Sequence, residues 1–195
     1  MKNKLSILII LGVSLIGCSP KEDSLELSES TSLSHVFSDS EIDELKVAFD
    51  FFNNELCEGQ KITNDCYQAF FQMLNKNNEL GFVELPISYE AQQIMYQRIS
   101  ENLKSEVWSR KWTKNGVDTI GSIYISDKGR YMAYLEKCGE TNDLLKIYLD
   151  DFISAGGIFP GMVEGYEYEG NESVDFHLIM AIHFLTLNDQ FEREK

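Results

Sequence analysis

The stretch Val174–Leu187, with the sequence Val-Asp-Phe-His-Leu-Ile-Met-Ala-Ile-His-Phe-Leu-Thr-Leu, decides how the rest of the chain must be arranged. On a helix its apolar side chains would cover almost the whole circumference rather than a single stripe. A helix that is apolar on every side must be buried among other elements. With 14 residues the stretch is too short to cross a bilayer, which takes about 20 apolar residues. It therefore predicts a central helix inside a helical domain.

The segments that precede this helix have the apolar spacing of amphipathic helices. Ile42, Leu45, Phe49 and Phe52 recur at three- and four-residue intervals, which places them on one helical face. A short polar residue stands at the start of each such segment, where its side chain can cap the first backbone N–H groups. Helices are therefore expected to begin at Ser38, at Thr63 or Asn64, at Ser88, at Ser126-Asp127 and at Thr141 or Asn142.

The extent of the helix from Ser88, and the segment after it, leave alternatives open. That helix has Leu103 on its inner face and either ends there or continues to Trp108 and Trp112. Val117–Ile125 is rich in β-branched residues, so it forms a lone strand, one arm of a small hairpin or an extended loop. The predicted fold class is mostly α: an irregular single-domain bundle of about five to six helices around a buried C-terminal helix, with at most a small β element near 117–125.

The first eighteen residues have the organisation of a secretory signal. Lys2 and Lys4 precede the short apolar run Leu5–Leu15, and the sequence Leu-Ile-Gly-Cys then ends at Cys18. This arrangement resembles the lipobox of bacterial lipoproteins, in which a signal peptidase cleaves before the cysteine. The resemblance implies that Cys18 becomes the lipid-bearing N-terminus. In that family the N-terminus carries more than one acyl chain, which holds the protein stably at a membrane.

The residues after Cys18 indicate which membrane holds the protein. In the lipoprotein family an aspartate at the next position retains the protein at the inner membrane, and this chain has Ser19 there. The segment Lys21–Asp23 resembles the lysine-plus-acids export signal of some surface-exposed lipoproteins, and an ordinary polar tether is the alternative. The protein is expected to be an outer membrane lipoprotein of the cell envelope. The sequence leaves open whether it lies on the periplasmic face or on the surface face of that membrane.

Composition divides the chain into three parts. Residues 1–17 are the expected lipoprotein signal peptide. Residues 18–37 are rich in Ser and Glu, which suits a flexible tether between lipid and fold. Residues 38–195 are the expected helical domain, which is long enough to bury a core of its own.

The chain is acidic, with 17 Lys and Arg against 32 Asp and Glu. A surface of this sign repels phosphate backbones, so no nucleic-acid partner is expected. It also repels anionic lipid, which leaves the acyl chains as the link to the membrane. Basic proteins and cations are the partners that the charge favours, although acidity also serves solubility alone.

Three cysteines remain for the domain once Cys18 carries lipid. Cys57 and Cys66 lie on either side of a turn between two expected helices. Because the envelope is oxidising, a disulfide between them is expected to join those helices into a hairpin. Closing a loop of this size stabilises a fold by roughly 3 kcal/mol. Two unpaired cysteines are the alternative, and Cys138 is expected to be a buried thiol.

No catalytic or metal-binding constellation is evident. The phosphate-binding loop, the nucleophile elbow and the dinucleotide fingerprint do not occur. His177 and His183 would lie about 120° apart around the C-terminal helix, so they cannot form a zinc-binding i,i+4 pair. They are expected to be core or rim histidines whose ring nitrogens are satisfied by hydrogen bonds. The acidic segment Glu164–Asp175 could hold a cation but lacks the spacing of an EF-hand. The sequence gives no reason to expect a cofactor or a resident metal.

One basic and aromatic patch interrupts this acidic chain. Trp108, Arg110, Lys111 and Trp112 lie within five consecutive positions. Their residue types suit contact with an acidic partner or with a glycan ring. The alternative is that they form the amphipathic end of the helix from Ser88. These four residues are the candidate binding patch.

Together these observations favour a lipid-anchored, non-enzymatic module that binds a protein partner through one face of a helical bundle. An immunity-type lipoprotein that neutralises a basic toxin is a narrower form of this hypothesis. One alternative is an envelope hydrolase with two carboxylates about 5–10 Å apart in a cleft. Another is a structural lipoprotein, which would have neither a pocket nor a large exposed apolar patch.

Overall fold

The computed structural model describes residues 26–59, 64–77, 85–115, 118–163, 166 and 173–193. In these ranges the chain is mostly α-helical with one two-stranded antiparallel sheet, which confirms the predicted fold class. The elements in chain order are η1 (Leu27–Glu29), α1 (Thr31–Ser34), α2 (Asp39–Leu56), α3 (Asn64–Asn77), α4 (Tyr89–Tyr96), α5 (Glu101–Val107), β1 (Trp108–Asn115), β2 (Asp118–Ile125), α6 (Arg130–Gly139), α7 (Asp143–Ala155), η3 (Pro160–Val163) and α8 (Val174–Arg193).

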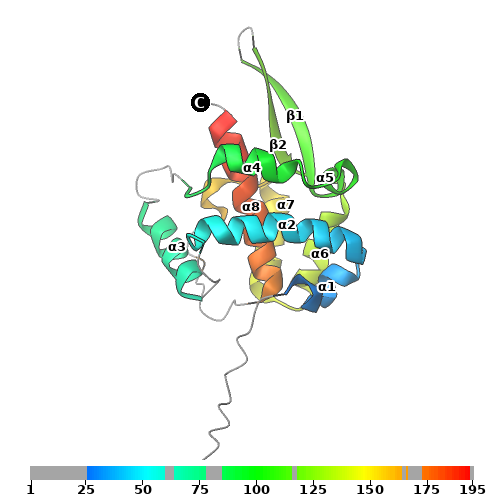
Figure 1. Ribbon diagram of the computed structural model, residues 1–195. Coiled ribbons are helices and arrows are strands. Elements are labelled where there is room, and N and C mark those ends of the chain that lie inside the picture. The colour runs from blue at the N-terminus through cyan, green and yellow to red at the C-terminus, as the bar shows by residue number, and fades with distance from the viewer. Residues whose placement is uncertain are drawn as a thin grey trace, which may run out of the picture.

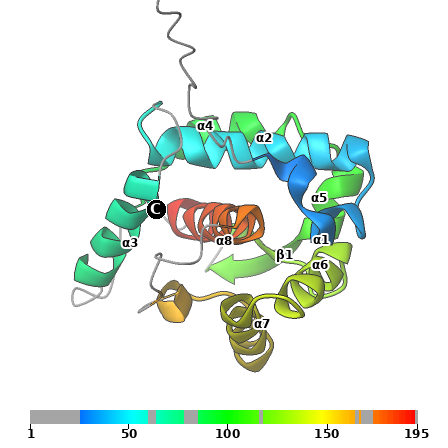
Figure 2. The same cartoon turned by 90° about the horizontal axis from the view of Figure 1, so that it is seen from below.

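α8 passes through the middle of the molecule, as Figure 2 shows along the helix axis. Every residue from Phe176 to Asp189 is buried. The Phe184 ring packs edge to face on Phe70 of α3 at 4.8 Å and lies stacked at 6.1 Å from Phe52 of α2. Aromatic pairs of this kind add about 0.5–1.5 kcal/mol beyond the burial of their area. The prediction of a central buried helix is confirmed.

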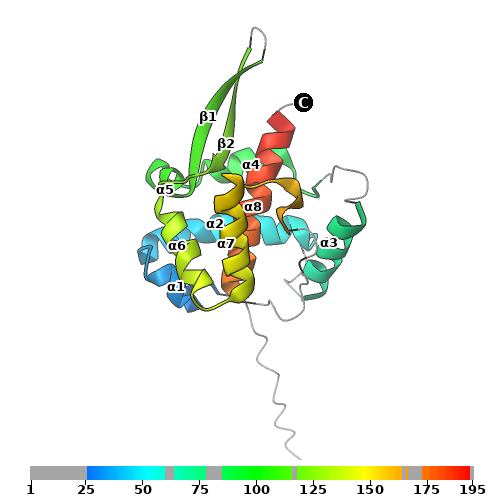
Figure 3. The ribbon, with the colours of Figure 1, turned by 180° about the vertical axis from the view of Figure 1, so that it is seen from behind.

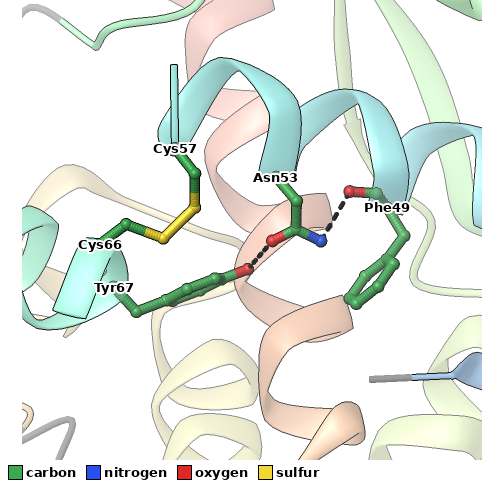
Figure 4. The surroundings of a disulfide bond; sticks show 5 residues. All are labelled: Phe49, Asn53, Cys57, Cys66 and Tyr67. Carbon is green, nitrogen blue, oxygen red and sulfur yellow. Dashed lines mark hydrogen bonds between the residues drawn. A yellow bond between two sulfur atoms is a disulfide. The ribbon is translucent and has the colours of Figure 1, made fainter. Parts of the chain in front are cut away.

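A disulfide and a buried hydrogen-bond chain join α2 to α3 (Figure 4). Cys57, at the end of α2, is bonded to Cys66 in the first turn of α3, as predicted. Beside the bridge, the Tyr67 hydroxyl donates to the Asn53 side-chain oxygen at 2.6 Å, and the Asn53 amide donates to the carbonyl of Phe49 at 2.9 Å. Both side chains are buried, so these bonds satisfy groups that would otherwise destabilise the fold.

The folded domain begins earlier than predicted. η1 and α1 lie inside the predicted tether of residues 18–37 and place Leu27, Leu33 and Phe37 in the core, each at most 3% exposed. The Ser30 hydroxyl accepts from the N–H of Leu33 at 2.9 Å and donates to the Asp175 carboxylate of α8. The predicted boundary at residue 38 is therefore wrong. Three scattered apolar side chains and one serine dock a segment whose composition is that of a linker.

The helix predicted from Ser88 is shorter than expected and is divided. α4 ends at Tyr96, and α5 begins after Ser100, whose hydroxyl accepts from an N–H in the first turn at 3.3 Å. The chain enters β1 at Trp108, so the continuation of this helix to Trp112 is wrong. The division, together with α1, brings the α-helices of the described ranges to eight, against about five to six expected.

α6 begins at Arg130, later than the predicted cap at Ser126. Gly129 is the N-cap residue and offers no side chain, so the Glu106 carboxylate of α5 accepts from the N–H of Arg130 at 2.9 Å instead. A Cβ at Gly129 would overlap the backbone carbonyl of Glu106, so only glycine allows this approach. The Arg130 guanidinium also reaches Glu41 of α2, and its hydrogen bond is the main cause that lowers the pKa of Glu41 to about 2.

Gly129→Ala is expected to lower the free energy of unfolding by about 1–3 kcal/mol, because the added methyl group forces α5 away from the start of α6. Urea unfolding followed by circular dichroism measures this loss. Gly139→Ala is the comparison variant, since its methyl group would come within 3.3 Å of Lys146 Cα, a tight contact that requires a much smaller shift than the 2.0 Å approach at Gly129 and should cost less. Equal losses in the two variants would contradict the close approach at Gly129.

Candidate functional site

β1 and β2 form an antiparallel hairpin that projects from one end of the helical body (Figures 1 and 3). The predicted β element is thus one arm of a small hairpin, and the predicted binding patch lies on the other arm. Side chains alternate between the two faces of a strand. Trp108, Arg110 and Trp112 therefore share one face, while Lys111 lies on the opposite face. The hairpin separates the four residues of the patch.

Trp108 anchors the base of the hairpin to α8. Its side chain is buried, and its indole N–H donates to the Thr186 hydroxyl at 3.0 Å. Thr186 in turn donates to the carbonyl of Ile182 at 2.6 Å, and the Tyr96 ring of α4 packs edge-on against Trp108 at 5.2 Å. Trp108 is therefore a buried residue that fixes the base of the hairpin, and its part in the predicted binding patch stays a prediction.

Trp112 is exposed and held in place at the same time. It is 64% exposed, although its ring lies against Gly121, its neighbour across the hairpin. A Cβ at Gly121 would come within 2.6 Å of that ring, so the glycine provides the space in which the indole sits. The Arg110 guanidinium lies 5.8 Å from the ring centroid, within reach of a cation–π contact. Arg110 and Trp112 are the part of the predicted patch that faces solvent together.

A cleft of about 360 Å³ opens between this face of the hairpin and the helices α4 and α5. Tyr96 and Trp108 contribute rings to its lining, and Arg110 contributes a cation. Glu101 and Lys104 also line it and pair with each other at 2.8 Å, a hydrogen bond that lowers the pKa of Glu101. Aromatic walls combined with a few polar groups are typical of sites that bind organic or peptide ligands.

A second cleft, of about 300 Å³, lies on the other face of the hairpin, against the end of α7. Lys111 and Tyr124 line its hairpin side, with the Lys111 ammonium 4.6 Å from the centre of the Tyr124 ring. Ile153 of α7 lines the opposite side and is 60% exposed. The residues that line this cleft include one carboxylate, that of Asp127. The hairpin is thus flanked by a cleft on each face, and each face carries one cation of the predicted patch.

The two histidines of α8 are core residues, one of the two predicted placements, but the prediction that their ring nitrogens are satisfied is wrong for Nε2 of His183, which has no hydrogen-bond partner among the described residues. The Tyr148 hydroxyl of α7 lies 3.1 Å from Nδ1 of His183, whereas the His177 ring packs against the Tyr67 ring of α3 at 4.2 Å. The two rings therefore face different helices. Burial lowers the pKa of His177 to about 4 and that of His183 to about 3. Both imidazoles stay neutral in the fold at neutral pH and are out of reach of a solvent-borne substrate.

Cys138 is a buried free thiol, as predicted. Burial raises its pKa to about 12, and the nearby Asp175 carboxylate adds to this effect. The thiol therefore stays protonated and is a poor nucleophile. Asp175 accepts hydrogen bonds from the hydroxyls of Ser30 and of Tyr134, the latter at 2.9 Å. These contacts tie the half-buried Asp175 to Ser30 and to α6.

The acidic segment that the sequence suggested for a cation lies mostly outside the described residues, which include Asp175 but not Glu164, Glu167, Glu169 or Glu172. Among the residues that are described, no group of three or more His, Cys, Asp and Glu side chains is arranged to hold a metal ion. Cys18 also lies outside the described residues, so its lipidation stays a prediction. Along the described part of the chain, no helix combines the length and the apolar character needed to cross a bilayer.

Two residues of the candidate site, one on the hairpin and one on α7, were not singled out from the sequence. Gly121 interrupts a run rich in β-branched residues, and an isolated glycine in a strand marks a bulge or a close approach. That signal was available, although it does not say which ring approaches. Ile153 gave no usable signal, because a single apolar residue on the outer face of a helix is common. Its relevance comes from the second cleft.

Comparisons with known proteins assign no family to this chain. No family model, no curated protein and no solved structure matches it. The features that bear on function are therefore the geometry of the hairpin and the resemblance of the N-terminus to a lipobox.

The free energy of unfolding is expected to fall as the pH is lowered from 7.5 to 5. His177 and His183 stay neutral in the fold, whereas unfolded histidines have a pKa of about 6.5 and bind protons in this range. The stabilisation that comes from their lowered pKa values is complete above pH 6.5 and is lost as the pH falls toward 4. Each histidine contributes a loss of roughly 2 kcal/mol by pH 5, measured by urea unfolding at several pH values.

His183→Phe is expected to make the change between pH 7.5 and pH 5 smaller by roughly 2 kcal/mol, whatever its effect on stability at pH 7.5. Ile147→Ala is the control, because it changes an exposed side chain that carries no titratable group. The same pH dependence in His183→Phe and in the unmodified protein would refute the assignment of a buried neutral imidazole.

Proposed function

We propose that this chain is a lipid-anchored protein of the bacterial cell envelope that binds a partner protein through its hairpin. The observation that carries the proposal is the exposed Trp112, seated on Gly121 and flanked by Arg110, on an element that projects from the fold. Tryptophan and arginine dominate the binding energy of protein interfaces. A side chain that is already held in place loses little conformational entropy when a partner covers it.

The lipid anchor is supported by the lipobox and fits the arrangement of the fold. Leu27 begins the first element that the structure describes, and a link of residues 19–26 lies between it and Cys18 in the sequence. Fully extended, that link spans at most about 30 Å. η1 and α1 lie at the end of the body opposite the hairpin (Figures 1 and 3). A lipid at Cys18 would therefore hold the protein with its hairpin directed away from the bilayer, at the outer membrane.

A binding module accounts for the described residues better than the two alternatives. A carboxylate-pair hydrolase needs two acids about 5–10 Å apart in a cleft. Each cleft beside the hairpin has one carboxylate in its lining, Glu101 in the first and Asp127 in the second. A third cleft, along α2, has two, Asp43 and Asp50, but the Asp50 carboxylate is held in an ion pair with Lys46 at 2.8 Å. A purely structural lipoprotein would not need an exposed tryptophan between two clefts. An immunity-type role against a basic toxin is a narrower form of the same proposal.

The first part of the test concerns the lipidation and the location of the protein. Wild-type protein grown with a labelled fatty acid is expected to carry the label and to fractionate with the outer membrane, whereas Cys18→Ala is expected to lose the label. Cys138→Ala is the control, because that thiol is buried and would keep the label of the wild type. Label retained in Cys18→Ala would remove the lipid anchor from the proposal.

The second part concerns binding. A photo-crosslinking amino acid at the exposed Ser105, beside the first cleft, is expected to form a discrete adduct in intact envelopes. Trp112→Ala should reduce this adduct at least about tenfold, since a central tryptophan typically contributes 2 kcal/mol or more to an interface. Ile147→Ala is the matched control, as it removes another exposed apolar side chain, on α7, outside both clefts. Equal adduct yields in the two variants would overturn the hairpin as the binding surface.

A further inference from the structure

We propose that the outer edge of β1 is a strand-addition site, at which an extended acidic segment of the partner pairs with the backbone of Arg110 and Trp112. The inference rests on the proposed function, because it states how the hairpin would hold its partner. Strand addition supplies affinity through main-chain hydrogen bonds and specificity through alternating side chains.

The register of the hairpin shows which backbone groups point outward. The N–H of Ser126 donates to the carbonyl of Val107 at 2.9 Å, and the two strands continue in register from that pair. In an antiparallel ladder, positions that bond to the partner strand alternate with positions whose N–H and C=O point away from it. Counting in twos from Val107, Ser109 and Lys111 bond to β2. Arg110 and Trp112 therefore direct their backbone groups to the outer edge of β1, and by the same count Ile123 does so on β2.

The outer edge of β2 is already occupied at Ile123. The Asp189 carboxylate of α8 accepts from the N–H of Ile123 at 3.3 Å, and the Gln190 side-chain amide donates to its carbonyl at 2.9 Å. Two side chains of α8 thus take the place of a neighbouring strand there. These bonds also confirm that the backbone groups of Ile123 point outward, as the register requires. An added strand is excluded from this part of β2.

The outer edge of β1 is open. Figures 1 and 3 show β2 on the side of α8 and β1 on the far side of the hairpin. No residue in the described ranges forms a hydrogen bond with the backbone N–H or C=O of Arg110 or Trp112. Unpaired groups of this kind on a strand edge are a template for another strand.

Charge selects the occupant of this edge. β1 carries Arg110, Lys111 and Lys114 and no acid, within a chain of net charge −15. Basic residues on an exposed edge discourage pairing between two copies, because like charges would then face each other. The same residues attract a strand that carries Glu or Asp. The basic side chains of β1 therefore favour an acidic segment of a partner over a second copy of this chain.

The first cleft provides room for the side chains of the added strand. It borders β1 on the face of Arg110 and Trp112, and the rings of Tyr96 and Trp108 line it. A strand paired with β1 would place every second side chain over this cleft and the others over the face of Lys111. An alternating pattern with apolar residues toward the cleft and acids toward Lys111 would suit both faces.

The test uses a fluorescent octapeptide of alternating valine and glutamate, titrated against the purified full-length protein by fluorescence anisotropy. The matched peptide has lysine in place of glutamate. The glutamate peptide is expected to bind and the lysine peptide to bind at least about tenfold more weakly, since a like-charge contact costs several kcal/mol. No binding of the glutamate peptide up to millimolar concentration, or equal binding of both peptides, would overturn the proposal.

Two variants of Trp112 separate the backbone from the side chain. Trp112→Ala keeps the outward N–H, whereas Trp112→Pro removes it, and proline is tolerated on a strand edge where its missing N–H faces solvent. Trp112→Pro is expected to raise the Kd for the glutamate peptide about tenfold beyond the effect of Trp112→Ala. Equal Kd values in the two variants would overturn strand addition. If both variants nevertheless bind the peptide more weakly than the wild type does, the proposed function of the hairpin surface still stands.

A third variant keeps the test decisive if Trp112→Pro fails to fold. Lys111→Glu, on the face that receives the acids, is expected to weaken the glutamate peptide and to strengthen the lysine peptide, reversing their order. An unchanged order would overturn the charge argument. If sedimentation instead shows a dimer that Trp112→Pro dissociates, while neither peptide binds, the occupant is a second copy of the chain and the proposal is wrong.

Discussion

The fold depends on keeping most polar groups of a largely buried helix hydrogen-bonded. α8 has polar residues among its apolar ones, and a buried polar group without a partner costs about 1–3 kcal/mol. Elements on several sides of α8 supply partners for it. The pairs are Asp175 with Ser30 and Tyr134, His183 with Tyr148, Thr186 with Trp108, Asn188 with Gln92, and Asp189 with Gln93 and Ile123. These bonds fix the rotation and the height of α8 among its neighbours, which apolar packing alone leaves less well specified.

The two ends of α8 hold the two parts of the chain on which the proposed function depends. Near its start, Asp175 accepts from Ser30, in the segment that follows the proposed lipid-bearing cysteine. Near its end, Thr186 and Asp189 hold the base of the hairpin. With 20 residues α8 is about 30 Å long. A buried helix of that length is a rigid spacer, which would set the distance between the membrane side and the binding side.

Signals in short stretches of the sequence were enough to predict the buried helix and the disulfide. The all-round apolar character of α8 predicted its burial, and the spacing of Cys57 and Cys66 predicted the bridge. The docking of η1 and α1 was not predictable in this way, since Ser30 finds its partner 145 positions away. The composition of β1 does not favour a strand, and only pairing with β2 makes it one.

The candidate site was predictable in composition but not in arrangement. Trp108, Arg110, Lys111 and Trp112 stood out as a basic, aromatic cluster in an acidic chain. A helix would have spread them around its circumference, and the strand instead divides them between two faces. Whether a tryptophan anchors the core or meets a partner depends on what lies across from it. Trp108 finds Thr186, whereas Trp112 finds Gly121 and stays exposed.

The most direct test of the central role of α8 is native-state hydrogen exchange of its backbone amides, followed by NMR. The account predicts that amides between Phe176 and Leu187 exchange only through global unfolding, with the highest protection in the protein and a free energy equal to that from urea unfolding. Exchange of these amides through a local opening of markedly lower free energy would contradict it. In that case the surrounding helices would hold together without α8, and the hairpin would lack a fixed base.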